Sequence, residues 1–139
     1  MKHASIINRG FTLLEILVVL TVIGTLVVIS FPRYTLTIER SRAQQGEHLL
    51  LTLLGAQKRF FLENNNTYAD NLAGLDIEPR SSEYFLDITD ADISDTVDNL
   101  AQIQRRDGAA TRYTLSVNQD GTIGCADGSQ TGICTKLGY

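Results

Sequence analysis

The C-terminal part of the sequence has little positive charge. Residues 64–139 contain five lysine or arginine residues against twelve aspartate or glutamate residues, and the chain of 139 residues has a formal net charge of -4. Because binding to nucleic acid phosphates needs a positive field, this balance disfavours nucleic acid as a partner. Arg105, Arg106 and Arg112 form a small basic group, which we expect to be paired with nearby aspartates.

The sequence also lacks the residue patterns of an enzyme or a metalloprotein. It has no nucleophile paired with a base, no phosphate-binding glycine loop and no cluster of metal ligands. Its two cysteines, Cys125 and Cys134, match no zinc-binding spacing. The acidic segment 87–99 does not have the D-x-D-x-D-G spacing of a calcium loop, so we expect a solvated loop there. The sequence thus predicts no catalytic site, no metal and no cofactor.

A long apolar stretch begins near the N-terminus. Residues 11–31 contain one charged residue, Glu15. As a helix they would span about 30 Å, the thickness of a hydrocarbon core. Lys2 and Arg9 precede the stretch without any acidic residue, so the positive-inside rule predicts a cytoplasmic N-terminus and an exported remainder. No A-x-A-like site follows the stretch, which argues against an ordinary cleaved secretory signal and favours an uncleaved anchor.

Membrane insertion alone does not explain Glu15. A carboxylate near the centre of a bilayer costs about 2.5–3.5 kcal/mol on insertion scales, and one nearer the edge still needs a partner. A cut between Gly10 and Phe11 would create a positive α-amino group four residues before Glu15. This amine could pair with Glu15 of the same chain or of a neighbouring chain. Such a pair adds little net stability but can fix the register of helices in a polymer.

The string Arg9-Gly10-Phe11-Thr12-Leu13-Leu14-Glu15, followed directly by the apolar run, resembles the class III signal of type IV pilins and related pseudopilins. The resemblance implies that a prepilin peptidase cuts after Gly10, that Phe11 becomes N-methylated, and that Glu15 is the assembly carboxylate. It divides the chain into a leader peptide 1–10, a transmembrane and filament-core helix 11–31, an amphipathic second half of that helix 32–63, and a globular head 64–139.

Gly24 and Pro32 lie where many pilins have a helix-weakening glycine and a proline. Pro32 lacks an amide hydrogen and disfavours helix at the residue before it. Gly24 weakens a helix by about 1 kcal/mol relative to alanine. Two alternatives stay open: the membrane helix stops at Pro32, or it continues and can melt between Gly24 and Pro32 within a filament.

A second helical pattern follows Pro32. Residues 49–61 carry a broad apolar stripe at helical period, which should pack on a sheet. Residues 40–48 have almost no apolar side chain, which suggests a polar zone between membrane and head. Three asparagines, residues 64–66, mark the end of the helix. The stripe consists of Leu49, Leu50, Leu53, Leu54, Ala56, Phe60 and Phe61.

The remaining residues predict a small antiparallel sheet. Residues 64–79 are expected to form a loop with a short turn or helix, and they loosely resemble the segment after the long helix in PilE-like minor pilins. Strands are expected at 84–89, 112–117, 122–125 and 133–135, with a turn at 118–121. Together with the resemblance, these patterns predict an α+β fold, in which the C-terminal half of a long hydrophobic helix packs on the sheet as in type IV pilins.

Cys125 and Cys134 flank the short segment ADGSQTGI. Export would place both thiols in an oxidising compartment. The spacing is similar to the C-terminal disulfide loop of many pilins, and the resemblance therefore implies a disulfide here. Two free cysteines are the alternative.

The resemblance implies a structural subunit of a type IV pilus, a surface filament for adhesion, twitching motility or DNA uptake. The implied partners are other pilin subunits, prepilin peptidase, an inner-membrane platform with its assembly ATPase, an outer-membrane secretin, and membrane lipid before assembly. The precursor would cross the inner membrane once with its N-terminus in the cytoplasm, and the assembled subunit would be extracellular. The similarity to PilE-like proteins slightly favours a minor subunit.

Three alternatives to a surface pilus stay open. A pseudopilin of type II secretion would be favoured by calcium bound in the 87–98 loop. A monomeric signal-anchored binding module would keep an unprocessed N-terminus. A competence pilin would bind DNA through Arg105, Arg106 and Arg112.

Overall fold

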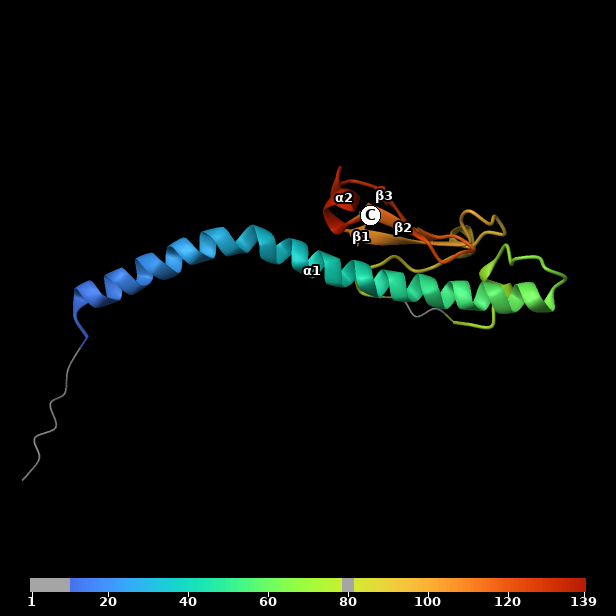
Figure 1. Ribbon diagram of the computed structural model, residues 1–139, viewed down its shortest axis with the longest axis horizontal. Helices are drawn as coiled ribbons and strands as arrows, with labels where there is room; N and C mark the ends of the chain where they lie inside the picture. Colours follow the sequence, from blue (N-terminus) through green and yellow to red (C-terminus); the bar gives the residue numbers. More distant parts are fainter. Residues whose placement is uncertain (1–10, 79–81) are drawn as a thin grey trace, which may run out of the picture. The chain divides into compact units, whose positions relative to one another are not determined.

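The computed structural model describes residues 11–78 and 82–139, and only the backbone of residues 31–33. The chain divides into two compact units, with the boundary between Thr35 and Leu36. The elements, shown in Figure 1, are α1 (Leu13–Glu63), η1 (Leu72–Gly74), η2 (Asp90–Asp92), β1 (Ala101–Asp107), β2 (Ala110–Val117), β3 (Ile123–Asp127) and α2 (Ile133–Leu137).

The helix α1 has 51 residues and passes through both Gly24 and Pro32. The alternative in which Pro32 ends the membrane helix is therefore wrong. A proline inside a helix costs about 3 kcal/mol, and good helix formers on both sides can outweigh this cost. The predicted end is confirmed: α1 stops at Glu63, and Asn65 and Asn66 adopt the left-handed conformation, with φ of 53° and 59°.

The sheet is antiparallel with strand order β1-β2-β3. Leu115 of β2 pairs with Ile103 on one side and with Cys125 on the other. The strands predicted at 112–117 and 122–125 are confirmed as β2 and β3, and the turn between them is confirmed as well.

Two strand predictions are wrong. Residues 84–89 form no strand, because β1 occupies the ladder beside β2 and leaves Phe85 a single isolated bridge to Arg105. Residues 133–135 belong to the helix α2, which follows Gly132 in the left-handed conformation. The predicted turn in 64–79 is confirmed as η1, where the Asn71 side chain accepts a hydrogen bond from the Gly74 amide.

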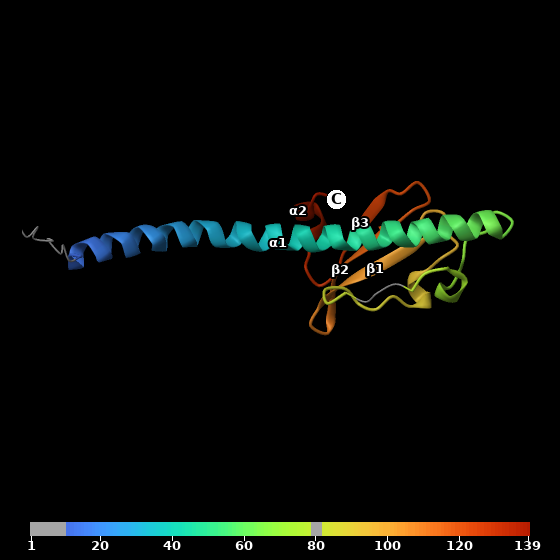
Figure 2. The ribbon, with the colours of Figure 1, turned by 90° about the horizontal axis from the view of Figure 1, so that it is seen from below.

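The sheet packs on the C-terminal half of α1, and Figures 1 and 2 show the two side by side. This arrangement confirms the predicted α+β fold, and the apolar stripe of α1 supplies its share of the core. Fully buried side chains from the helix and the sheet include Leu50, Leu53, Ala56, Ile103, Tyr113, Leu115 and Val117, and Leu100 just before β1 is fully buried as well.

A buried glutamine ties the loops to this core. Gln57 Nε2 donates to the carbonyl oxygens of Ala69, Ser94 and Leu100 at 2.9, 3.2 and 3.3 Å. Its Oε1 accepts from the amide of Ala69 at 2.9 Å. Because buried polar backbone groups need partners, this one side chain fixes two loop segments on the helix.

The helix already packs on the sheet where a polar zone was expected at 40–48. Ala43 is 3 % exposed, and Gly46 is buried. A Cβ on Gly46 would lie 2.6 Å from Phe85 Cζ and 2.9 Å from Ile103 Cδ1. The prediction is wrong because small residues, rather than large apolar ones, let the helix approach the sheet closely here.

Gly46→Ala is expected to destabilise the head. The added methyl overlaps the buried Phe85 ring, and overpacking of this kind costs about 1–3 kcal/mol. Gly55→Ala is the matched control, because its Cβ would meet only Arg59 Nη1 at an ordinary 3.6 Å, and alanine favours the helix. Thermal unfolding followed by circular dichroism in detergent should therefore show a lower melting temperature for the first variant and an equal or higher one for the second. An unchanged melting temperature for Gly46→Ala would contradict the close packing.

Candidate assembly segment and head anchor

The first turn of α1 is capped by Thr12. Its Oγ1 accepts a hydrogen bond from the Glu15 amide at 3.2 Å, and its carbonyl accepts from the amides of Glu15 and Ile16. Thr12 and Glu15 have the spacing of a capping box, and an acid in the first turn is also favoured by the helix dipole. This is a local reason for Glu15 that the sequence analysis missed. The Thr12 cap does not involve Phe11, and Gly10 lies outside the described residues.

The N-terminal part of α1 is an exposed apolar surface. Residues Leu13–Ser30 have a mean hydropathy of 2.6, and none of them is buried, so this segment is long and apolar enough to cross a membrane. Large exposed side chains on it include Leu13, Leu14, Leu17, Leu20, Ile23, Leu26 and Ile29, and Phe11 just before α1 is exposed as well. A contiguous apolar surface of this size marks a membrane or protein interface.

Glu15 is the exception among the polar side chains of this surface. The hydroxyls of Thr21, Thr25 and Ser30 each donate to a carbonyl of the preceding turn at 2.8 Å, so each is satisfied inside its own helix. Within the described residues the Glu15 carboxylate has no such partner. It is therefore the one group between residues 13 and 30 that calls for a partner from outside this segment.

Gly24 has no close neighbour that would explain a glycine: a Cβ built there meets no atom within 4 Å among the described residues. The helix continues through Pro32, whose side chain is not described. That these two residues weaken the helix in a filament stays a prediction.

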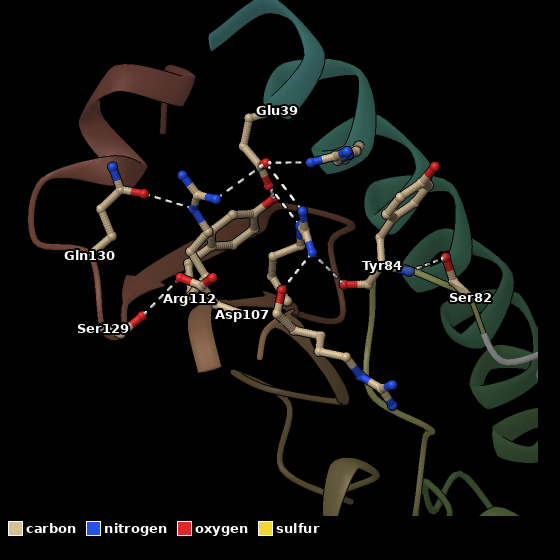
Figure 3. A network of polar contacts seen from close by, with 11 residues as sticks. Glu39, Ser82, Tyr84, Asp107, Arg112, Ser129 and Gln130 are labelled. Carbon is tan, nitrogen blue, oxygen red and sulfur yellow. Dashed lines mark hydrogen bonds and ion pairs between the residues drawn. The ribbon is translucent and has the colours of Figure 1, made fainter. Parts of the chain in front are cut away.

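A second cluster lies on the head, around the buried carboxylate of Glu39, and is shown in Figure 3. Arg105 binds it with two nitrogens, Nε at 2.7 Å from Oε1 and Nη2 at 3.2 Å from Oε2. Tyr113 donates its hydroxyl at 3.2 Å, and nitrogens of Arg42 and Arg112 lie at 3.3 and 3.7 Å. The expected pairing of the arginines with aspartates is therefore wrong for Arg105 and Arg112, which are paired with Glu39 of α1.

The charges around Glu39 determine its protonation. Burial by itself would raise the pKa of Glu39, but the hydrogen bond and charge of Arg105, the charge of Arg112 and the hydrogen bond from Tyr113 outweigh it and lower the pKa below its usual value. Burial and the neighbouring Glu39 raise the pKa of Tyr113. The cluster therefore holds a carboxylate and a neutral phenol, and it anchors β1 and β2 on α1.

Cys125 and Cys134 form a disulfide with a Cα–Cα distance of 5.7 Å, so the alternative of two free cysteines is wrong. Inside the closed loop, Asp127 accepts hydrogen bonds from the amides of Cys134 and Gly132. These two amides lower the pKa of Asp127. The loop 125–134 is thus closed by the disulfide and further held by the hydrogen bonds to Asp127.

Replacing both cysteines by serine is expected to lower the free energy of unfolding by about 2–3 kcal/mol, which the chain-entropy model gives for a loop of this length. Chemical denaturation in detergent measures the difference, and the oxidised wild type treated with reductant is the comparison. Reductant should shift the wild type toward the double variant and leave the double variant unchanged. A wild type that is equally stable with and without reductant would contradict a stabilising disulfide.

Parts of this chain are similar to known proteins. The motif described as "Prokaryotic N-terminal methylation motif" matches residues 7–31. The chain is 40% identical over 63 residues to the type IV major pilin protein PilA of Myxococcus xanthus, a match that covers 45% of this chain and 28% of that protein. It is 31% identical over 67 residues to the fimbrial protein EcpC of Eikenella corrodens, covering 48% of this chain and 44% of that protein.

The matches confirm the resemblance to type IV pilins, a family of structural subunits. They span less than half the length of each of these two relatives. No solved structure matches the chain.

Proposed function

We propose that this chain is a structural subunit of a type IV pilus that polymerises through residues 11–31. The observation that carries the proposal is an exposed apolar helical segment of membrane-spanning length, Leu13–Ser30, that lies within the match to the methylation motif at residues 7–31. Its surface suits two environments in turn. Lipid covers it in the inner-membrane precursor, and the equivalent helices of other subunits cover it in the filament.

The cut after Gly10 gives Glu15 its partner in this proposal. Prepilin peptidase hydrolyses the peptide bond between Gly10 and Phe11, and Phe11 becomes the N-methylated terminus. Thr12 still caps α1 after the cut, because the cap uses only Thr12 and the residues after it. At about 4 Å and an effective dielectric constant near 20, the amine and Glu15 attract one another by about 4 kcal/mol before desolvation. The pair sets the stagger between neighbouring helices.

The other parts of the chain take the roles that this assembly needs. Residues 1–10 are the leader, 11–31 the membrane anchor and filament core, 32–63 the second half of the helix, and 64–139 the exposed head. The partners are other pilin subunits, prepilin peptidase, the membrane platform with its ATPase, and a secretin. The precursor lies in the inner membrane with a cytoplasmic N-terminus, and the pilus is extracellular. The chain itself has no catalytic step.

Imaging and protein analysis of purified surface filaments test the proposal. We expect this chain in the filaments, as their bulk if it is the major subunit and at low copy if it is a minor one. Filaments confined to the periplasm would indicate a type II secretion pseudopilin instead. A chain that stays monomeric in the membrane would overturn the proposal.

A further inference from the structure

One end of the head carries carboxylates without partners. This acidic end consists of Asp95, Asp98 and Asp120, whose exposed side chains make no hydrogen bond or ion pair among the described residues. Backbone contacts bring these residues to the same end of the head. Ile93 bridges to Ala101 at the start of β1, and the Gln119 amide donates to the carbonyl of Val97 at 2.9 Å. The loop that carries Asp95 and Asp98 and the β2–β3 turn therefore lie together at one end of the strands.

The opposite end of the head carries the basic residues. β1 ends and β2 begins there, with Arg106 and Arg112 near that end. Arg40 Nη2 donates to the carbonyl of Lys136 at 2.9 Å, which places the basic residue of α2 beside α1 at the same end. The basic end is defined here as Arg106, Arg112 and Lys136 of the head, together with Arg40 and Arg42 of the part of α1 that packs on it.

The acids at the basic end are largely engaged within the chain. Two nitrogens of Arg105 donate hydrogen bonds to Glu39, and the backbone amides of Gly132 and Cys134 donate to Asp127. Asp107 makes only a long contact, 3.5 Å, with the hydroxyl of Ser129. Glu83 is also exposed and unpaired among the described residues, beside Tyr84, whose carbonyl accepts from the Arg106 amide. The basic end still carries more positive groups than free carboxylates, whereas all three carboxylates of the acidic end are free.

The two ends are separated along the strands. β1 has seven residues, and at about 3.4 Å per residue it separates them by about 20 Å. The same order holds along α1, because Arg40 binds at the basic end whereas Gln57 reaches the carbonyls of Ser94 and Leu100 near the acidic end. The head is therefore electrically polar along its length.

We propose that, in the polymer proposed above and resting on it, the basic end of one head docks on the acidic end of the head of another copy. Copies related by a repeated screw operation keep one head orientation, so a contact between two different ends of a head propagates without closing, as a filament requires. Arginine donors suit carboxylate acceptors, and complementary ends both fix the register and disfavour the reversed orientation.

Paired charge reversals test this docking. Arg106→Glu with Lys136→Glu reverses two of the five charges at the basic end, and Asp95→Lys with Asp98→Lys reverses two of the three at the acidic end. All four side chains are exposed and lie outside the Glu39 cluster. Each reversal alone is expected to reduce the number of filaments about tenfold, and the two combined should restore most of them. Arg106→Lys with Lys136→Arg keeps the charge and should assemble normally.

Each other outcome overturns the docking in a recognisable way. If the reversals have no effect while the unaltered chain forms filaments, or if the combined variant is as poor as the singles, heads do not dock by these charges. If the basic reversal lowers binding of the detergent-solubilised chain to anionic phospholipid vesicles and the acidic reversal leaves filaments normal, the basic end binds lipid instead. If the unaltered chain forms no filaments at all, the pilus proposal itself has failed.

A salt titration on unaltered filaments is a second measurement that needs no variant. Raising the salt from about 0.1 M to about 1 M shortens the Debye length from about 10 Å to about 3 Å. Filaments held by the docked charges should then break more readily, whereas filaments of equal length at both salt concentrations would contradict the docking.

Discussion

Replacing Glu15 by glutamine is expected to leave membrane insertion and cleavage intact and to abolish most filaments. In the proposed filament the substitution leaves the Phe11 amine without its counter-charge in the apolar core, and breaking a buried pair in this way costs about 3–5 kcal/mol. That corresponds to a loss of more than about a hundredfold in assembly equilibrium. Counting filaments by electron microscopy, with cleavage checked by mass spectrometry, measures the effect.

Thr12 provides the control, because its hydroxyl caps α1 by accepting a hydrogen bond from the Glu15 amide. The cap uses the backbone amide of Glu15 and not its carboxylate, so Glu15→Gln keeps the cap and removes the charge. Thr12→Ala does the reverse: it removes the cap, at about 1 kcal/mol, and keeps the carboxylate. We expect Thr12→Ala to assemble. Filaments of normal number and length in Glu15→Gln would show that the carboxylate has another purpose.

Glu39→Gln is expected to lower the free energy of unfolding of the head by about 3–5 kcal/mol. The carboxylate and the Arg105 guanidinium are only 4% and 7% exposed, so removing the negative charge leaves a buried positive charge unpaired. Asp76→Asn is the matched control, because Asp76 also binds an arginine, Arg59, at 2.7 Å, but on the surface, where such a pair contributes about 1 kcal/mol or less. Chemical denaturation in detergent compares the two. Equal losses for both variants would contradict the proposed anchor.

The pH dependence gives a second test of the Glu39 cluster. Because the pKa of Glu39 is lowered in the folded state, its contribution is fully present above the ordinary glutamate pKa, which is about 4.3. That contribution is lost as the pH falls through the lowered pKa. The wild type should therefore lose stability below about pH 4.3 more steeply than Glu39→Gln. Parallel curves for the two proteins in this range would contradict a carboxylate stabilised by Arg105.

The sequence predicted those parts of the fold in which side-chain pattern and local structure agree. The apolar run is long enough to span a membrane as a helix, the stripe at 49–61 has helical period, and three asparagines follow the stripe, so α1 and its end were predictable. β2 and β3 alternate around an Asp-Gly turn and were predictable for the same reason. The disulfide was implied by the pilin resemblance.

The errors lie where contacts between distant residues decide the structure. β1 has a regular alternation, with Ala101, Ile103 and Arg105 buried, but the third inward position is an arginine, which conceals the pattern. That arginine is acceptable inside only because Glu39, 66 residues earlier, faces it. No sequence pattern near Arg105 or Glu39 predicts that the two residues form an ion pair. The need for glycine at position 46 could not be predicted for the same reason, because the ring that packs against it belongs to the distant Phe85.

Mass spectrometry of the N-terminal peptide of this chain, taken from purified filaments, tests the central claim most directly. We predict a peptide that begins at Phe11 and carries an N-methyl group on its α-amine. The cut after Gly10, and not the methylation, creates the α-amino terminus that the proposal pairs with Glu15. A mature chain that still begins at Met1, or that retains residues 1–10 in the filament, would contradict the pilin assignment and, with it, the role proposed for Glu15.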